Sequence, residues 1–364
     1  MSVDTRVGVH TIGEILSQPD TWARCCTLLE NSGELSQAST ALPGNVEWVF
    51  VGCGSSFFLA EIAAATWSME TGERARALPA SEILLFPSLF PQPSQPVLIS
   101  RSGETSEVVE AAAWFRQNHS SQILGITCAQ ATRLEKFCDY IIRLSPADER
   151  STVMSRSFTS MLLALQCLAA KRAGRVNVER VVHALRAETE KLLPSMQTTI
   201  DSLVRAGNSE DYVFLGQGPF FGVAQEAMLK VKEMSCSYAQ SFHTLEFRHG
   251  PKAIVSPRTL VTFFLSEKGM EQELAVLEEV KSLGGQVLAI TNLASSRMAG
   301  AADQVISLEL DVPEPFRAAA AVIPAQLLGY YTGLRKGFDP DHPRHLTRVV
   351  MLQGTDGGGA GSGS

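Results

Sequence analysis

Short apolar runs recur along the chain and alternate with longer stretches of helical periodicity. The runs are largely apolar rather than alternating, which is typical of parallel strands covered by helices on both faces. The stretches between them, such as residues 106–118 and 270–283, carry apolar positions at helical spacing. Strands that alternate with helices predict an open α/β sheet. The expected strands are residues 46–51, 97–100, 123–127, 140–144, 212–215, 260–265, 286–291 and 304–308.

Three of these runs recur at one constant offset of 164 positions. The matched pairs are Val49–Gly54 with Val213–Gly218, Leu124–Thr127 with Leu288–Thr291, and Asp139–Ile142 with Asp303–Ile306. A constant offset across separate runs indicates a duplicated unit. The copies diverge after the second expected strand, where Ser-Arg-Ser-Gly-Glu-Thr (Ser100–Thr105) becomes Phe-Leu-Ser-Glu-Lys-Gly (Phe264–Gly269). We therefore expect a doubled fold with an anion site in the first copy only.

The duplication divides the chain into four parts. Residues 1–40 are expected to form a helical lead-in, 41–195 the first domain, 196–340 the second, and 341–364 a C-terminal segment. A helical connection is expected near residues 176–205. Residues 357–364 consist of Gly, Ser and Ala alone, which predicts a flexible end.

Composition excludes several classes of function. The chain has 364 residues, of which 45% are apolar and 19% are charged, as in a soluble protein with a large core. A net charge of −7 argues against non-specific nucleic-acid binding. No apolar run is long enough to cross a bilayer and no secretory signal is apparent, so we expect a cytoplasmic protein without a membrane partner. The seven cysteines lack metal-ligand or paired spacing, and no metal site is expected.

Two loops of small residues are candidates for binding an anion. Gly52–Ser56 and Ser100–Thr105 each lead from an expected strand into an expected helix, and the carboxyl ends of such strands lie side by side. The second loop offers three hydroxyls, a guanidinium and the backbone N–H groups of a helix start. The alternative is an ordinary N-cap or capping box. Gly52-x-Gly54 lacks the third glycine of a dinucleotide site, which we reject.

Three further clusters carry mixed charge. Glu226, Lys230 and Glu233 share one face of a predicted helix, for which the alternative is a solvated, salt-bridged surface. Glu246–Lys252 combines a carboxylate, two cations and an imidazole beside a Gly-Pro turn, which is typical of a loop that faces a polar ligand. His342–Arg348 lies near the C-terminus, where the alternative is a basic surface tail.

These motifs together resemble the double sugar-isomerase-domain (SIS) family of phosphosugar isomerases. That family includes the isomerase half of glutamine–fructose-6-phosphate amidotransferase and amino-sugar-phosphate deaminase/isomerases. The resemblance runs from about residue 12 to residue 350. It implies two tandem SIS domains, each a parallel sheet in a flavodoxin-like three-layer αβα arrangement. The motifs are Gly52–Ser56, Ser100–Thr105, Glu149–Ser160, Glu226–Glu233, Glu246–Pro251 and Pro343–Arg348.

The resemblance also implies roles for individual residues. Glu233 matches the base that moves a proton between C1 and C2 of the sugar. His249 matches a residue that assists ring opening from the partner subunit, which implies a homodimer with shared active sites. The chemistry needs no metal or organic cofactor. The substrate-binding positions are Gly54, Ser55, Ser56, Ser100, Arg101, Ser102, Thr105, Thr152 and Lys230, with the phosphate on Ser100, Ser102 and Thr105.

Two departures from the amidotransferase set the expected direction of the reaction. Only a short lead-in precedes the first domain, so no glutaminase domain is expected to supply ammonia. Arg348 stands at the third catalytic position, where the amidotransferase has a Schiff-base lysine, and arginine stays protonated. We therefore expect an amino-sugar-6-phosphate deaminase/isomerase acting on glucosamine or galactosamine 6-phosphate.

Four alternatives remain open. Three are enzymes: a plain aldose–ketose isomerase, a fructosyl-amino-acid-6-phosphate deglycase and an ammonia-using aminotransferase. The fourth is a non-catalytic sugar-phosphate sensor, against which the retained Glu233 and His249 argue.

Overall fold

Two parallel sheets with the same strand order organise the chain. The computed structural model describes residues 7–44, 46–90, 93–119, 121–174, 176–207 and 209–349. Within them, one five-stranded sheet has the order β2-β1-β3-β4-β5 and the other the order β10-β9-β8-β6-β7. The strands of the first sheet are β1 (Glu47–Gly52), β2 (Ala75–Pro79), β3 (Ser94–Ile99), β4 (Leu124–Thr127) and β5 (Tyr140–Arg143). Those of the second are β6 (Asp211–Gly216), β7 (Tyr238–His243), β8 (Thr259–Phe264), β9 (Gln286–Thr291) and β10 (Gln304–Ser307).

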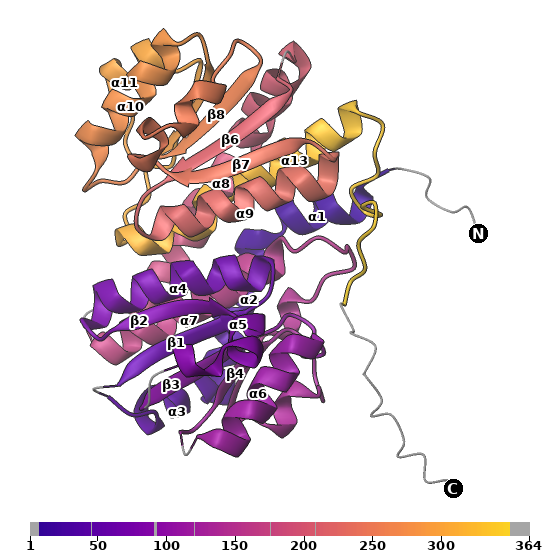
Figure 1. Ribbon diagram of the computed structural model, residues 1–364, viewed down its shortest axis with the longest axis vertical. Helices are drawn as coiled ribbons and strands as arrows, with labels where there is room; N and C mark the ends of the chain where they lie inside the picture. The colour runs from indigo at the N-terminus through magenta and orange to yellow at the C-terminus, as the bar shows by residue number, and fades with distance from the viewer. Residues whose placement is uncertain are drawn as a thin grey trace, which may run out of the picture.

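Helices cover both faces of each sheet (Figure 1). The α-helices are α1 (Val9–Leu16), α2 (Gln18–Ser32), α3 (Glu34–Ala41), α4 (Ser55–Thr71), α5 (Ala80–Leu85), α6 (Ser106–Asn118), α7 (Arg156–Ala173), α8 (Val178–Ala206), α9 (Pro219–Ser235), α10 (Met270–Ser282), α11 (Ser296–Ala301), α12 (Ala318–Ala321) and α13 (Ile323–Arg335). Short 3-10 turns are η1 (Pro87–Leu89), η2 (Leu134–Lys136), η3 (Ser145–Ala147), η4 (Glu246–Arg248), η5 (Pro251–Ile254) and η6 (Glu314–Arg317).

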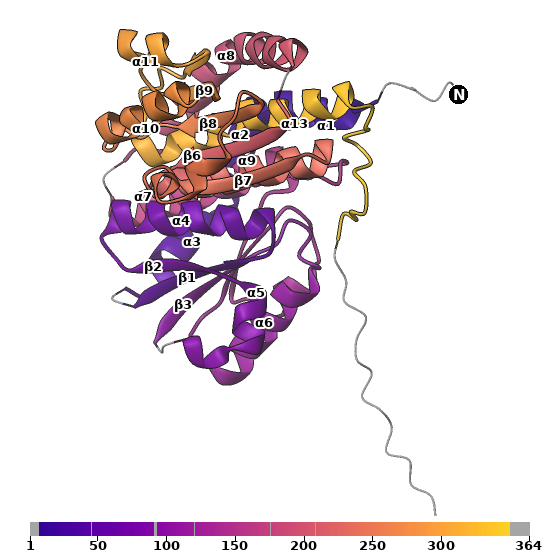
Figure 2. The ribbon, with the colours of Figure 1, turned by 45° about the horizontal axis from the view of Figure 1, so that its top comes forward.

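One core, shared by both domains, lies between the two sheets. Trp48 and Phe50 of β1 and Phe214 of β6 are fully buried in it, together with apolar residues of α4, α7, α9 and α13. The alternate residues of β1, such as Val49, pack outward against α5 and α6, while α10 and α11 cover the outer face of the second sheet. Figure 2 shows these outer helices on opposite sides of the molecule. The two domains are therefore joined through a common apolar layer, in which α4 packs on α9.

The duplication predicted from the sequence is present in three dimensions. β1 and β6, α4 and α9, and α6 and α10 begin and end at positions related by the same offset. Gly54 (φ 56°, ψ −127°) and Gly218 (φ 53°, ψ −128°) adopt the same backbone conformation at the start of α4 and α9. That region of φ favours glycine. The α/β architecture and the eight expected strands are confirmed, with shifts of one to three residues at some ends.

Each sheet also has an edge strand that the apolar pattern did not predict. β2 is half-buried along its whole length, and β7 combines two exposed residues with polar ones. The apolar pattern missed these two strands because an edge strand need not be apolar throughout. The expected boundary between residues 195 and 196 falls inside α8, and residues 357–364 lie outside the described part of the chain. None of the described helices combines the length and apolar character that crossing a bilayer requires.

Candidate active site

The two candidate anion loops lie at one edge of the first sheet. β1 pairs with β3 in parallel, with Val51 opposite Leu98, so the loops that follow these strands emerge next to each other. The order of the sheet reverses here, because β1 is flanked by β2 on one side and by β3 on the other. Ligands of open α/β sheets bind at such a reversal. The expected juxtaposition of Gly52–Ser56 with Ser100–Thr105 is therefore confirmed.

The loop Ser100–Thr105 is folded tightly around its own hydroxyls. The Ser100 Oγ accepts the N–H of Gly103 at 3.1 Å and lies 3.1 Å from the Thr105 Oγ1. Gly103 has a φ of +65°, and a Cβ on it would stand 2.5 Å from the Thr132 side chain. Thr105 is the N-cap residue of α6, yet its side chain makes no capping hydrogen bond. The capping-box alternative is thus not formed, and the helix start is left without a side-chain cap.

The Arg101 guanidinium turns toward protein groups. It is buried, its Nη1 is 3.4 Å from a carboxylate oxygen of Glu149, and its Nη2 donates to the carbonyl of Arg348 at 2.9 Å. Glu149 in turn accepts from the N–H and hydroxyl of Ser155, each at 2.7 Å. Arg101 thereby ties the anion loop to the loop after η3 and to the C-terminal segment.

A second buried carboxylate holds the loop that carries Thr152. Glu14 of α1 accepts the N–H of Arg150 at 2.5 Å and the hydroxyl of Ser151. Burial raises the pKa of Glu14, and the Ser151 hydroxyl partly offsets that effect. Thr152 itself is half-buried between these anchors. The substrate-binding role expected for it stays a prediction.

The charged face of α9 meets the first domain at Ser55. The Lys230 Nζ lies 2.6 Å from a Glu233 oxygen, 3.2 Å from a Glu226 oxygen and 3.2 Å from the Ser55 Oγ. The Ser55 Oγ also donates to Glu226 at 3.1 Å. Helical spacing correctly predicted the shared face, but the solvated alternative is wrong. This cluster places the expected base Glu233 beside one of the two candidate anion loops.

Burial sets the electrostatics of that cluster. The side chains of Glu226 and Lys230 are fully buried, and that of Glu233 is 18% exposed. Burial raises the pKa of Glu226 to about 7, against a lowering by the Lys230 charge. Burial opposes the charge on Lys230, but the two carboxylates outweigh it and raise the pKa of the ammonium. One oxygen of Glu226 is buried and has no hydrogen-bond partner among the described residues. The arrangement can store and move a proton in a site largely closed to water.

The loop Glu246–Lys252 is anchored by its cations and exposes its imidazole. Arg248 and Lys252 both pair with Glu279 of α10, at 3.0 and 2.5 Å. Phe247 is fully buried in the outer core of the second domain. His249 is exposed, and its ring makes no hydrogen bond with other described residues. The two cations thus hold the loop on its own domain, while His249 remains accessible from outside the chain.

The C-terminal cluster reaches the first domain. Arg348 is exposed, its guanidinium pairs with Asp148 at 2.5 Å, and its carbonyl accepts from Arg101. Two other members of the cluster, Arg344 and His345, are exposed. Arg348 therefore lies beside the loop that carries Thr152, and its catalytic role stays a prediction.

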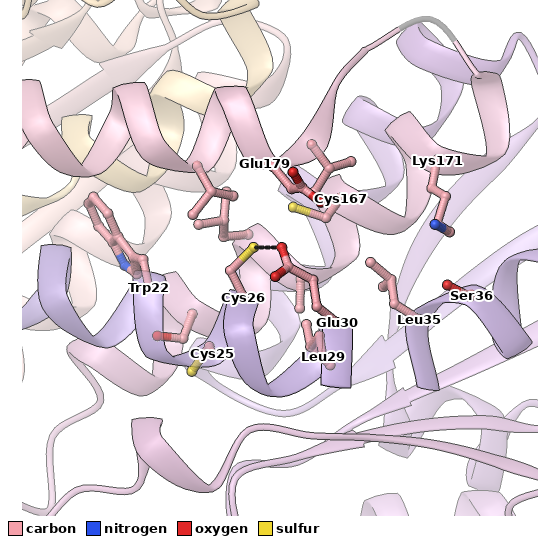
Figure 3. Close-up of a pocket in the computed structure, with 15 residues that line it drawn as sticks. Trp22, Cys25, Cys26, Leu29, Glu30, Leu35, Ser36, Cys167, Lys171 and Glu179 are labelled. Atoms are coloured by element: carbon pink, nitrogen blue, oxygen red, sulfur yellow. Dashed lines mark hydrogen bonds between the residues drawn. The ribbon is translucent and has the colours of Figure 1, made fainter. Parts of the chain in front are cut away.

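Three of the seven cysteines share one cavity. Cys25, Cys26 and Cys167 line a cavity bounded by α2, α3, α7 and α8, where the Cys26 thiol lies 3.1 Å from a Glu30 oxygen (Figure 3). Burial raises the pKa of the Cys25 and Cys26 thiols to about 12. Across the described ranges, no His, Cys, Asp and Glu side chains group in a way that could hold a metal ion.

Comparison with known proteins settles the family. The SIS domain model matches residues 47–171 and 208–332, more than half of the chain. The chain belongs to the SIS domain family. Each match coincides with one of the two sheets and its helices. Proteins similar to this chain are named as phosphosugar isomerases or deaminases, in agreement with the resemblance seen in its motifs.

Its similarity to individual SIS proteins is moderate. It is 28% identical to the Streptomyces coelicolor protein named Putative D-galactosamine-6-phosphate deaminase AgaS, over 94% of both chains. It is also 28% identical to the glutamine–fructose-6-phosphate aminotransferase of Caldanaerobacter subterraneus, over 71% of this chain and 44% of that protein. The chain spans about half the length of the curated aminotransferases it matches.

Two solved SIS structures are similar over almost the whole chain. The glucosamine-6-phosphate deaminase of Thermotoga maritima is 30% identical with a TM-score of 0.77, covering 94% of this chain and all of that one. The tagatose-6-phosphate ketose/aldose isomerase of Escherichia coli is 24% identical with a TM-score of 0.83, covering 96% and 97%. The second likeness concerns the fold alone.

Three contacts of this SIS site were not predicted from the sequence. They are the hydrogen bond from Ser55 to Glu226, the pairing of Arg101 with Glu149, and the grip of Glu14 on Ser151. Each joins residues far apart in the chain, so no local spacing indicates it. The helical spacing in the sequence did single out Glu226 as a candidate, but it gave no indication that Ser55 is its partner.

Proposed function

We propose that the chain is an amino-sugar-6-phosphate deaminase/isomerase. It converts glucosamine or galactosamine 6-phosphate to a ketose 6-phosphate and ammonia. The observation that carries the proposal is the cluster at Ser55, where the first domain's small-residue loop meets Lys230 and Glu233 of the second. The Ser55 loop emerges beside the candidate phosphate loop Ser100–Thr105. A phosphate loop and a carboxylate base in one region are the parts that proton transfer on a phosphosugar needs.

Substrate binding uses the first domain. The phosphate lies on Ser100, Ser102 and Thr105, at the start of α6, where backbone N–H groups and the helix dipole favour an anion. Gly54 and Ser56 belong to the neighbouring loop after β1 and contribute to the same site. Lys230 and Ser55 hold sugar hydroxyls near Glu233. Arg101 keeps the loop in place through Glu149.

Proton transfer uses the second domain. His249 of a second copy assists ring opening, and its exposure on its own chain leaves the imidazole accessible to such a copy. Glu233 removes the C2 proton of the open aldose and returns it to C1, through a cis-enolamine. The product is an imine at C2, and water adds to it to give the ketose and ammonia. General acid–base residues of this kind contribute about 10²–10⁴-fold to a rate.

Two observations favour deamination over the alternatives. The relatives matched over nearly their full length include proteins named as galactosamine- and glucosamine-6-phosphate deaminases. Arg348 cannot form the imine that a lysine at that position would form, since its guanidinium stays protonated. Both point to ammonia release rather than ammonia transfer from glutamine.

A substrate screen tests the proposal. Purified protein is incubated with glucosamine, galactosamine and plain hexose 6-phosphates and with fructosyl-amino-acid 6-phosphates, and ammonia and ketose are both quantified. We expect equal amounts of ammonia and ketose 6-phosphate from a hexosamine 6-phosphate. Ketose formation from a hexose 6-phosphate alone would favour the plain isomerase. Tight binding of phosphosugars without any turnover would favour the sensor.

The shared site of a homodimer has its own test. Glu233→Gln and His249→Asn are each expected to be inactive as homodimers. A mixed dimer of the two variants has one site with an intact Glu233 from one chain and an intact His249 from the other. Recovery of activity on mixing is expected. No recovery, in a preparation shown to contain mixed dimers, would place both residues in a site within one chain.

A further inference from the structure

The second domain has a Ser-x-x-Gly turn whose hydrogen bond is similar to one in the first domain's candidate anion loop. After β8, the Ser266 Oγ accepts the N–H of Gly269 at 3.0 Å. After β3, the Ser100 Oγ accepts the N–H of Gly103 at 3.1 Å. Each Ser-x-x-Gly turn leads into a helix and lies at the reversal of its own sheet. By the offset of 164 positions Ser266 is equivalent to Ser102 and not to Ser100, so the second turn makes a similar hydrogen bond but lies two residues further along the repeat.

A carboxylate of the same chain lies in the second turn. The Glu273 side chain is fully buried, and its two oxygens accept from the Ser266 hydroxyl and the Ser266 N–H, both at 2.8 Å. A Cβ on Gly269 would stand 2.6 Å from a Glu273 oxygen, so the turn closes tightly around the carboxylate. Glu273 is the fourth residue of α10. The fourth residue of α6 is Val109, which is apolar and offers no carboxylate to the first turn.

Within the part of the chain that the structure describes, only the donors of the turn compensate this carboxylate. Among the described residues, Glu273 takes part in no ion pair, and the nearby charge of Glu314 opposes its own. Burial raises its pKa, and the hydrogen bonds from Ser266 lower it. A buried carboxylate is costly unless donors satisfy it. Hydroxyl and backbone N–H donors at a strand-to-helix turn are also the donors that hold a phosphate.

We propose that Glu273 is a built-in substitute for a phosphate and closes the second domain's turn to oxyanions. Each chain then carries one phosphate site, in the first domain, although it has two such turns. A cavity of about 370 Å³ remains in front of the second turn, lined by Gln217, Ser266 and Lys268 among others. Removal of the carboxylate would expose the Ser266 donors to this cavity, where Lys268 supplies a positive charge.

The test counts phosphate ions bound by the full chain. Inorganic phosphate is titrated calorimetrically into the wild-type protein and into Glu273→Ala. We expect Glu273→Ala to bind one more phosphate per chain than the wild type. The matched control is Glu271→Ala on the same helix, where an exposed carboxylate pairs with Arg297, and it should bind the wild-type number. Glu273→Gln keeps the turn filled and should also bind the wild-type number.

Two results would overturn the proposal. One is a folded Glu273→Ala protein that binds no additional phosphate. The other is a second-domain phosphate already bound by the wild type, shown by its loss in Ser266→Ala. If Glu273→Ala folds poorly in chloride, acetate or phosphate should raise its melting temperature by more than that of Glu271→Ala, which keeps only the first-domain site. Failure of both anions to do so would contradict the proposal as well. The difference between variant and wild type does not depend on the proposed reaction, so the two proposals can fail separately.

Discussion

Replacement of Lys230 by methionine removes the single cation at the centre of the α9 cluster. Lys230 is fully buried, and its Nζ contacts Glu233 at 2.6 Å, Glu226 at 3.2 Å and Ser55 at 3.2 Å. Methionine keeps the length of the side chain but leaves the buried Glu226 facing another carboxylate. Breaking a buried ion pair by removing one partner costs about 3–5 kcal/mol. We expect Lys230→Met to lose stability by that amount near pH 8.

The assay is denaturant unfolding followed by circular dichroism, at pH 8 and again near pH 6. Protonation of Glu226 removes the unpaired charge, so the deficit of Lys230→Met should shrink at the lower pH. Adding Glu226→Gln to Lys230→Met should recover a large part of the lost stability, since the two residues share one contact. The matched control is Lys232→Met, because Lys232 lies on the same helix and is exposed.

Two outcomes would refute this reasoning. A Lys230→Met protein within about 0.5 kcal/mol of the wild type, the usual range of a surface substitution, would mean that the ammonium is not a buried counter-charge. A large deficit that Glu226→Gln does not reduce would mean that lost packing, rather than the stranded carboxylate, causes it.

Three further outcomes are expected. Gly103→Ala should lower stability and phosphosugar affinity by more than Gly174→Ala, as measured by melting temperatures and ligand titrations. Both glycines have a left-handed backbone, which costs about 1–2 kcal/mol for a residue with a side chain. Of the two, only Gly103 has a neighbour within contact distance of an added Cβ. Because burial raises the pKa of Glu226 from 4.5 to about 7, the folded state holds this proton more tightly. Stability should therefore fall as pH rises through that window, by at most about 1.4 kcal/mol per pH unit, and Glu226→Gln should lack the slope in unfolding midpoints. Arg101→Gln should release the segment around Arg348, measured as faster tryptic cleavage there than in the wild type.

The positions of the two candidate anion loops and of the charged α9 face could be predicted because they follow from local sequence patterns. Apolar runs located the strands, and parallel strands bring their carboxyl ends to one edge, which placed Ser100–Thr105 beside Gly52–Ser56. Helical spacing placed Glu226, Lys230 and Glu233 on one face of α9. Neither inference needed the tertiary structure.

Burial and long-range partners could not be predicted in this way. The charged face of α9 is buried because α4 of the other domain packs on it. Ser55, which hydrogen-bonds to Glu226, is the first residue of α4. Arg101 was expected to contact substrate, whereas its guanidinium is engaged by Glu149 and the Arg348 carbonyl. Edge strands β2 and β7 lack continuous apolar runs, because only part of their surface packs on the core.

The central claim is that Glu233 moves the proton that leads to ammonia release. The most direct measurement compares ammonia release from glucosamine and galactosamine 6-phosphate by the wild type and by Glu233→Gln, with melting temperatures to verify that both are folded. The wild type should release ammonia and ketose in equal amounts from at least one of the two, and Glu233→Gln should be slower by about 10²–10⁴-fold. A folded Glu233→Gln protein that turns over as fast as the wild type would contradict the account.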